Sequence, residues 1–232
     1  RNQARRDALV TAWVALRRGI NVGGHRRVPM AELRELAGEL GLHDVRSYVQ
    51  SGNLVFRAAG DQAEYGAALE RAIERRFGFA VDVVVRDRER WQRYCAGAPF
   101  AGARSTEANR VFLVLAQAPP NPDCAEVLAP HATAGERIRV VGDAVWVHAP
   151  AGAGRSRLGG AVYDRAIGAP ATARNWNTVA AVQTLLADGG APVRFRMPGE
   201  TDWRTVVVPV KGQDMLVQRM TPLADGRIAL TT

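Results

Sequence analysis

Leu16-Arg-Arg-Gly-Ile-Asn-Val-Gly-Gly24 is the stretch that divides the first strand of this chain from its first helix. The apolar run before it, residues 8–16, is too short for a helix of normal length and predicts a buried strand centred on residues 12–16. After it, Pro29 is suited to open a helix whose apolar stripe is Met30, Leu33, Leu36 and Leu40, and Gly41 is suited to end it. The stretch is therefore a strand-to-helix loop of an α/β unit.

A hairpin and a second helix follow. Apolar residues at 45–49 and 54–56 flank Gln50-Ser-Gly-Asn53, a sequence typical of a tight turn in which Gly52 or Asn53 takes a positive φ angle. Asp61 and Glu64 have the spacing of a capping box, and the next helix is expected to bury Tyr65, Leu69, Ile73 and Phe77. With a strand at 81–85, the order is β-α-β-β-α-β, the split βαβ arrangement.

The same order of elements recurs farther along the chain. We predict a strand at 111–115, a helix at 124–130, a hairpin of strands 137–141 and 144–148 around Gly142-Asp143, a helix at 158–167 and a last helix at 178–186. Beyond Asp188 the pattern is strand-like at 193–196, 205–210, 215–218 and 228–231. The sequence thus predicts an α+β protein of two tandem α/β-plait (ferredoxin-like) subdomains, with a C-terminal helix and a β-rich extension. The expected boundaries are 8–86 for the first plait, 87–107 for a helix and a Gly/Ala/Pro-rich linker, 108–187 for the second plait with the helix, and 188–232 for the extension.

Composition is that of a globular protein. The 232 residues are 47% hydrophobic and 23% charged, and no apolar stretch approaches the roughly 18 residues that span a membrane. Cys95 and Cys124 lie on different predicted elements, so no disulfide framework is expected and a reducing, cytoplasmic location is predicted.

The net charge of +8 is concentrated near the start of the chain. Residues 1–30 carry seven arginines against Asp7 alone, which is +7 minus 1, or +6. Such a basic segment suits nonspecific attraction to nucleic acid, a binding mode that salt weakens steeply. Lys211 is the only lysine, however, so arginine is this chain's ordinary cation, and a compositional bias explains the charge equally well.

Several of these blocks resemble one family. The first stretch, with Val28-Pro-Met-Ala-Glu-Leu, is followed by Tyr48-Val-Gln-Ser-Gly-Asn-Leu-Val-Phe, Gly154-Arg-Ser-Arg-Leu and Arg174-Asn-Trp-Asn-Thr-Val, and together they are similar to the signature blocks of the bacterial domain-of-unknown-function 1697 family, over about residues 8–187. That resemblance implies two α/β plaits and brings no established activity or cofactor. One departure concerns the first block: the family usually reads Leu-Leu-Arg-Gly-Ile-Asn, whereas here Leu16 is followed by Arg17-Arg18.

Plait topology places the first loop and the hairpin together. The first two strands run parallel, so both segments are expected at the same end of the sheet. We predict that this end binds a small anionic or nucleotide-like ligand, because glycine-rich loops and amide side chains can cradle an oxyanion or a base edge. Arg174, next to an aromatic residue, is a further candidate for stacking or for holding a carboxylate. The predicted ligand-binding residues are Arg18, Asn21, Gly23, Gly24, Gln50, Ser51, Asn53 and Arg174.

Structural explanations compete with each of these assignments. Glycine and asparagine in tight turns serve the backbone alone, and Asn175, Asn177 or Thr178 could simply cap the last helix, with Trp176 packed in the core. The four histidines have no metal-ligand spacing and are expected in turns or at the surface. We therefore expect no metal and no cofactor, and no catalytic residue can be named, which leaves an enzyme of unidentified reaction open. A nucleic-acid-associated module using the basic segment is the alternative function, and the β-rich tail leaves self-association open.

Overall fold

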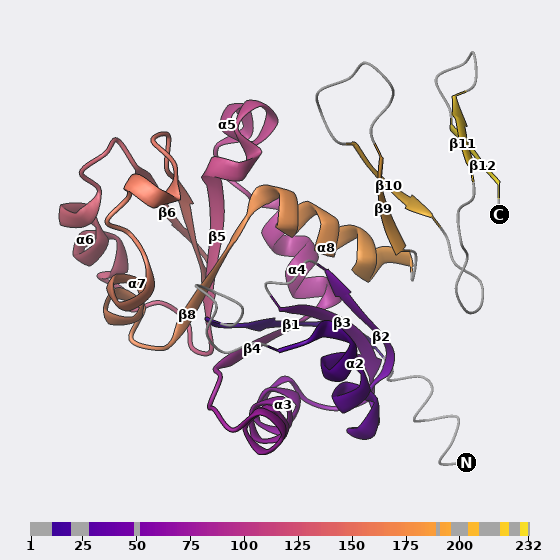
Figure 1. Cartoon of the computed structure of the whole chain (residues 1–232). Coiled ribbons are helices and arrows are strands. Elements are labelled where there is room, and N and C mark those ends of the chain that lie inside the picture. The colour runs from indigo at the N-terminus through magenta and orange to yellow at the C-terminus, as the bar shows by residue number, and fades with distance from the viewer. Residues whose placement is uncertain are drawn as a thin grey trace.

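The computed structural model describes residues 11–19, 28–48 and 52–188, together with the backbone of four strands nearer the C-terminus. Its body consists of two four-stranded sheets with helices on both sides of each (Figure 1). The fold is α+β with two tandem α/β plaits and a C-terminal helix, as the sequence predicts.

The first plait has the sheet order β2-β3-β1-β4, in which all neighbours are antiparallel. Gly52, at φ 82°, makes the turn before β3. Asp61 begins α3 by accepting a hydrogen bond from the Ala63 N–H, and Gly78 ends it in the left-handed region. The elements are β1 (Thr11–Arg17), α2 (Met30–Glu39), β2 (His43–Tyr48), β3 (Asn53–Ala58), α3 (Gln62–Phe77) and β4 (Val83–Asp87).

The second plait repeats this order as β6-β7-β5-β8. Its elements are β5 (Val111–Ala116), α6 (Cys124–Leu128), β6 (Arg137–Val141), β7 (Ala144–His148), α7 (Gly160–Ile167) and β8 (Ala171–Asn175), with short 3-10 turns at Ala108–Arg110, Ala129–His131 and Ala153–Arg155.

Two elements differ from the sequence prediction. Strand β8 was not predicted, because Thr172 is the one β-branched residue of Ala-Thr-Ala-Arg-Asn and the segment has no aromatic residue; its pairing with β5 determines its conformation. The linker expected at the end of segment 87–107 contains a helix, α5 (Ala101–Thr106).

Helices α4 (Arg88–Ala96) and α8 (Trp176–Asp188) lie between the two sheets (Figure 1). One hydrophobic core is shared there by both plaits, with Leu16 from β1, Leu113 from β5 and Trp91 from α4 among its buried members. Two further cores lie under α2 and α3 on the first sheet and under α6 and α7 on the second. Because both faces of β1 are covered, its sequence is a continuous apolar run and not an alternating one.

The C-terminal region contains two antiparallel strand pairs, β9 (Ala191–Phe195) with β10 (Arg204–Val208) and β11 (Arg219–Pro222) with β12 (Ile228–Thr231). The strand expected at 215–218 falls outside the described residues. Among the helices of the described part, none is both long and apolar enough to cross a membrane.

Candidate functional site

The end of β1 lies against the hairpin that precedes β3. The Arg17 N–H donates to the Gly52 carbonyl at 3.1 Å, and Leu16 is the strand partner of Asn53. The end of the first strand and the hairpin therefore lie together, as plait topology predicts. Arg17, Asn53 and Arg174 meet at this point, and we call them the arginine cluster.

Arg17 is the last residue of β1 and is only 1% exposed. Its Nε donates to the Gly52 carbonyl at 3.3 Å and its Nη2 approaches the Met30 sulfur at 3.6 Å, a weak acceptor. Its Nη1 is buried without a hydrogen-bond partner, and no carboxylate of the described residues forms an ion pair with it. Burial, together with repulsion from Arg174, lowers the pKa of Arg17 to about 9. This guanidinium is therefore a buried cation whose charge and hydrogen-bond donors are only partly matched by neighbouring groups.

Arg174 enters the cluster from β8 of the second plait. Its Nε donates to Asn53 Oδ1 at 2.5 Å and its Nη2 to the Arg17 carbonyl at 2.8 Å, so it joins the two plaits. Its Nη1 donates to the Thr172 hydroxyl and to the Ala173 carbonyl, at 2.6 and 2.8 Å. Desolvation by burial lowers its pKa to about 10. Arg174 is thus an internal connector and not the exposed residue that stacking on a base requires.

Asn53 is fully buried and holds the hairpin as well as Arg174. Its Nδ2 donates to the Tyr48 carbonyl at 2.9 Å while its Oδ1 accepts from Arg174. The Ser-Gly-Asn motif and the Arg-Asn-Trp-Asn motif, more than a hundred residues apart, are therefore in direct contact.

Arg18 occupies a different environment from Arg17. Its Nη2 pairs with Asp164 of α7 at 2.5 Å and its Nη1 with Asp82 at 3.4 Å, and all three side chains are partly exposed. This predicted ligand-binding residue is engaged by two carboxylates in the structure. Asn21, Gly23, Gly24, Gln50 and Ser51 fall outside the described residues, so their assignment to a ligand stays a prediction.

Sequence reasoning missed Arg17. The signal was present in the family comparison, since Arg17 occupies the place where the resembled family usually has a second leucine. The Arg17 side chain is buried because this position in the strand suits a buried leucine. An arginine there places a charge inside the core.

The aromatic residue of the last motif pairs with another arginine. The Arg104 guanidinium lies 4.5 Å from the centre of the Trp176 ring, and Trp176 packs beside Trp146. Asn175 Oδ1 accepts from the Thr178 N–H at 3.0 Å, as expected of a helix cap. The structure thus supports the capping explanation for Asn175.

His148 departs from the expectation of an exposed or turn histidine, because it is buried at the end of β7. Arginine can only donate, so Nδ1 accepts from Arg137 at 3.0 Å and the Nε2–H donates to Glu107 at 2.9 Å. The hydrogen bond from His148 lowers the pKa of Glu107. Across the described residues, no group of three His, Cys, Asp or Glu side chains is arranged to hold a metal ion.

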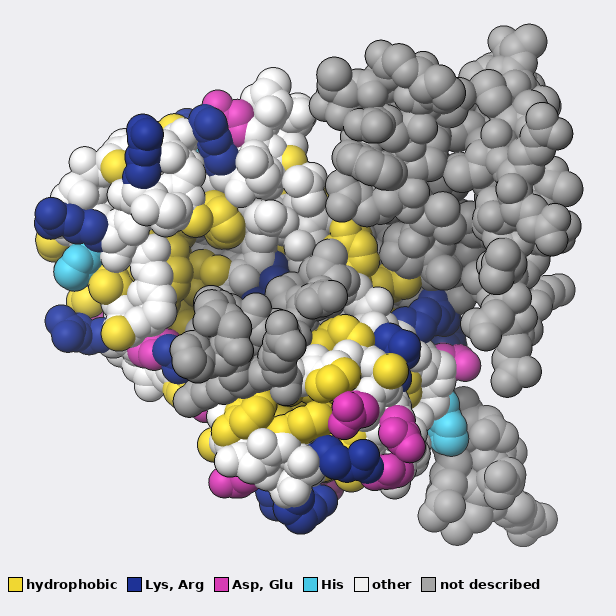
Figure 2. Space-filling view, in the orientation of Figure 1, with side chains coloured by type: hydrophobic (Ala, Val, Ile, Leu, Met, Phe, Trp, Pro, Cys, Tyr) yellow, Lys and Arg dark blue, Asp and Glu magenta, His cyan; other side chains and the backbone are white. Residues whose placement is uncertain are grey.

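The visible cations are spread over the surface. On the face shown in Figure 2, arginine side chains of the described residues occur on both plaits, and on the first plait they lie beside acidic side chains. The arginine cluster differs from them by its burial.

Comparisons with known proteins place the chain in a family. A family model described as "Protein of unknown function (DUF1697)" matches residues 10–146, and the blocks at 154–158 and 174–179 lie beyond that match. The structure of conserved bacterial protein SP0830 from Streptococcus pneumoniae aligns with a TM-score of 0.57 and 24% sequence identity, over 76% of this chain and 99% of the other, a likeness that concerns the fold. No curated protein matches the chain. With the matched residues covering more than half of its length, the chain belongs to the DUF1697 family of proteins of unknown function.

Proposed function

We propose that the protein binds a small anionic or nucleotide-like ligand at the end of the first plait, where β1 meets the hairpin, and that an oxyanion of the ligand is held by Arg17 Nη1. The observation that carries the proposal is this one nitrogen, which is buried and has no hydrogen-bond partner in the described part of the chain. An unsatisfied donor on a buried charged group is expensive, and buried charges are normally paired. An anion at Nη1 would supply both the acceptor and the opposite charge.

The position of Arg174 strengthens the attraction. Its guanidinium lowers the pKa of Arg17, so each positive charge raises the free energy of the other. The hydrogen bonds to Asn53, Thr172 and two backbone carbonyls hold Arg174 in place. An oxyanion beside Arg17 would reduce this repulsion without moving Arg174.

The alternative function, a nucleic-acid-associated module, relies on basic residues that lie mostly outside the described part of the chain. The two functions differ in their salt dependence. Polyanion binding releases counterions and weakens strongly with salt, whereas a buried arginine is screened far less.

Isothermal titration calorimetry with inorganic phosphate, AMP and single-stranded DNA, at about 50 and about 300 mM salt, separates the two. We expect saturable binding of phosphate or AMP that persists at the higher salt and is abolished by Arg17→Leu. Arg71→Leu is the matched control, since it removes the same charge from an exposed position on α3. Binding of DNA alone, lost at the higher salt and weakened equally by both substitutions, would contradict the proposal. Asn21→Ala then tests whether the glycine-rich loop contributes.

A further inference from the structure

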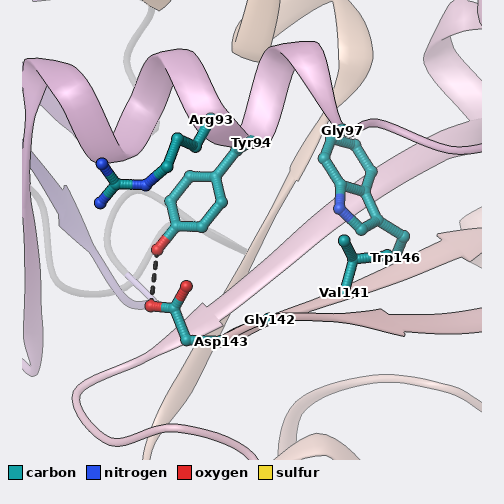
Figure 3. A pocket seen from close by; sticks show the side chains of 7 residues that line it. All are labelled: Arg93, Tyr94, Gly97, Val141, Gly142, Asp143 and Trp146. Carbon is teal, nitrogen blue, oxygen red and sulfur yellow. Dashed lines mark hydrogen bonds between the residues drawn. The ribbon is translucent and has the colours of Figure 1, made fainter.

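A second candidate site lies between α4 and the β6–β7 hairpin, away from the arginine cluster (Figure 3). It is a cavity of about 160 Å³, lined by Arg93, Tyr94, Gly97, Val141, Gly142, Asp143 and Trp146. Trp146 and Val141 form its apolar wall, and Val141, 41% exposed, is at the rim. A side chain at Gly97 would enter the cavity, because a Cβ there would lie 3.8 Å from Val141 Cγ1, in ordinary contact, and 3.3 Å from the Arg93 carbonyl oxygen.

Asp143 supplies the distinctive polar group. Its Oδ2 accepts from the Tyr94 hydroxyl at 2.7 Å and faces the Nε atoms of Arg90 and Arg86, at 3.1 and 3.6 Å. These contacts all use one oxygen. Asp143 Oδ1 forms no hydrogen bond with the described residues, and in Figure 3 it is the carboxylate oxygen on the side nearer Val141 and Trp146.

The Tyr94 hydroxyl itself is fully occupied. It donates to Asp143 and accepts from Arg86 Nε at 2.8 Å, and burial raises its pKa, so it stays protonated. Tyr94 therefore contributes its ring to the cavity and fixes the orientation of the Asp143 carboxylate.

A cation and an anion each meet a like charge at the cavity. Arg86, Arg90 and Arg93 against Asp143 give +3 minus 1, a local excess of +2 that opposes a cation. An anion in the cavity would have to approach Asp143 Oδ1. A neutral molecule with one hydrogen-bond donor meets neither objection, because it uses that oxygen as an acceptor.

We infer that this cavity binds a small neutral aromatic or heteroaromatic molecule that carries one O–H or N–H donor, with its ring against Trp146 and Val141 and its donor on Asp143 Oδ1. The volume of the cavity suits a ligand with one ring, since an engineered cavity of about 150 Å³ in another protein holds one benzene molecule. The pairing of an apolar wall with one well-placed polar group is the usual composition of a small-molecule site.

Four probes of similar size test the chemistry: phenol, toluene, benzoate and benzylammonium. Two-dimensional NMR titration of the full chain is expected to show saturable phenol binding in about the millimolar range, as few-atom ligands give. The shifts should centre on the amides of Gly97, Gly142 and Asp143. Toluene lacks the hydrogen bond to a charged acceptor and is expected to bind at least about tenfold more weakly; the two ions are expected to bind more weakly than phenol.

Gly97→Val fills the cavity and is expected to abolish phenol binding, since φ at this position is an ordinary −89°. Gly102→Val is the matched control, because a Cβ at that glycine meets nothing within 4 Å. The inference is overturned if phenol does not saturate, if toluene or either ion binds as well as phenol, or if the wild-type shifts lie elsewhere. The position of the wild-type shifts is measured without any variant, so the inference can still be contradicted if the Gly97→Val protein fails to fold.

Discussion

Arg17 and Ala116 occupy equivalent places in the two plaits. Each is the last residue of its plait's first strand, and each pairs with the first residue of the fourth strand, Val83 or Ala171. Asn53 is likewise the first residue of β3, as Ala144 is of β7. All four of the compared residues are at most 1% exposed.

The second plait therefore shows what this topology needs at its strand ends, which is two small apolar side chains. The first plait instead has a guanidinium and an amide, and the guanidinium leaves a donor unsatisfied. The Asn53 amide is explained by the fold, because it holds the hairpin and Arg174. The same strand order forms without the Arg17 guanidinium, which the fold alone does not explain. Under the proposed function, the first plait keeps this guanidinium to bind a ligand.

The largest expected effect comes from breaking the connection between the plaits with Arg174→Leu. This change removes the hydrogen bonds that Arg174 donates to Asn53 Oδ1 and to the Arg17 carbonyl, and loss of one partner from a buried polar network costs about 3 kcal/mol. Urea unfolding measures the loss. A change below about 1 kcal/mol would show that the cluster is not a structural connection.

Replacing Arg17 with an apolar residue, like the one at the equivalent place in the second plait, is expected to raise the free energy of unfolding. Arg17→Leu restores the leucine that the resembled family usually has there and removes the incompletely compensated charge. Replacing buried ionic groups by well-packed apolar ones is often stabilising, and we expect a gain of about 2 kcal/mol in the free energy of unfolding. A destabilised variant would mean that Arg17 is fully compensated in the native protein.

The stability gap between wild type and Arg17→Leu should depend on pH. The folded pKa of Arg17, about 9, lies below its ordinary value of 12.5, so above pH 9 the unfolded state binds more protons and wild-type stability rises relative to the variant. We expect the gap to narrow by about 1 kcal/mol between about pH 8 and pH 10. Parallel urea titrations of both proteins measure it, and taking the difference cancels the other titrating groups. A gap that is constant or widens contradicts a depressed pKa.

Arg18 should matter least. Its ion pairs with Asp82 and Asp164 are partly exposed, and such pairs contribute at most about 1 kcal/mol. Arg18→Gln is therefore expected to lower stability slightly at low salt and negligibly at high salt, because salt screens exposed charges. A large, salt-independent loss would place Arg18 with Arg174 as a determinant of the contact between plaits.

Local pattern was sufficient for most of the fold. The hairpin of β6 and β7 lies at the predicted residues because Gly142-Asp143 is flanked by apolar residues, and Asp61, one member of the predicted capping box, is the N-cap of α3. Strand β8 could not be predicted, because four of its five residues do not favour strands and its conformation depends on pairing with β5, more than fifty residues earlier.

The candidate site was predictable in its place but not in its chemistry. Topology alone brings the end of β1 to the hairpin, and Asn53 lies at that junction, while its role in ligand binding stays a prediction. Arg17 is buried and Arg18 is paired at the surface because β1 ends between them. Composition does not predict the end of a strand to within one residue. The contact of Arg174 with Asn53 depends on how the two plaits pack, and nothing in the local sequence indicates it.

The most direct test of the claim that the first plait keeps a buried cation for binding is the unfolding free energy of wild type and Arg17→Leu, each with and without phosphate. We expect the variant to be more stable without phosphate, and phosphate at about 100 times its dissociation constant to stabilise wild type alone, by about 2.7 kcal/mol. If phosphate and AMP stabilise neither protein, or stabilise both equally, Arg17 does not bind an oxyanion, and the difference between the plaits has another cause.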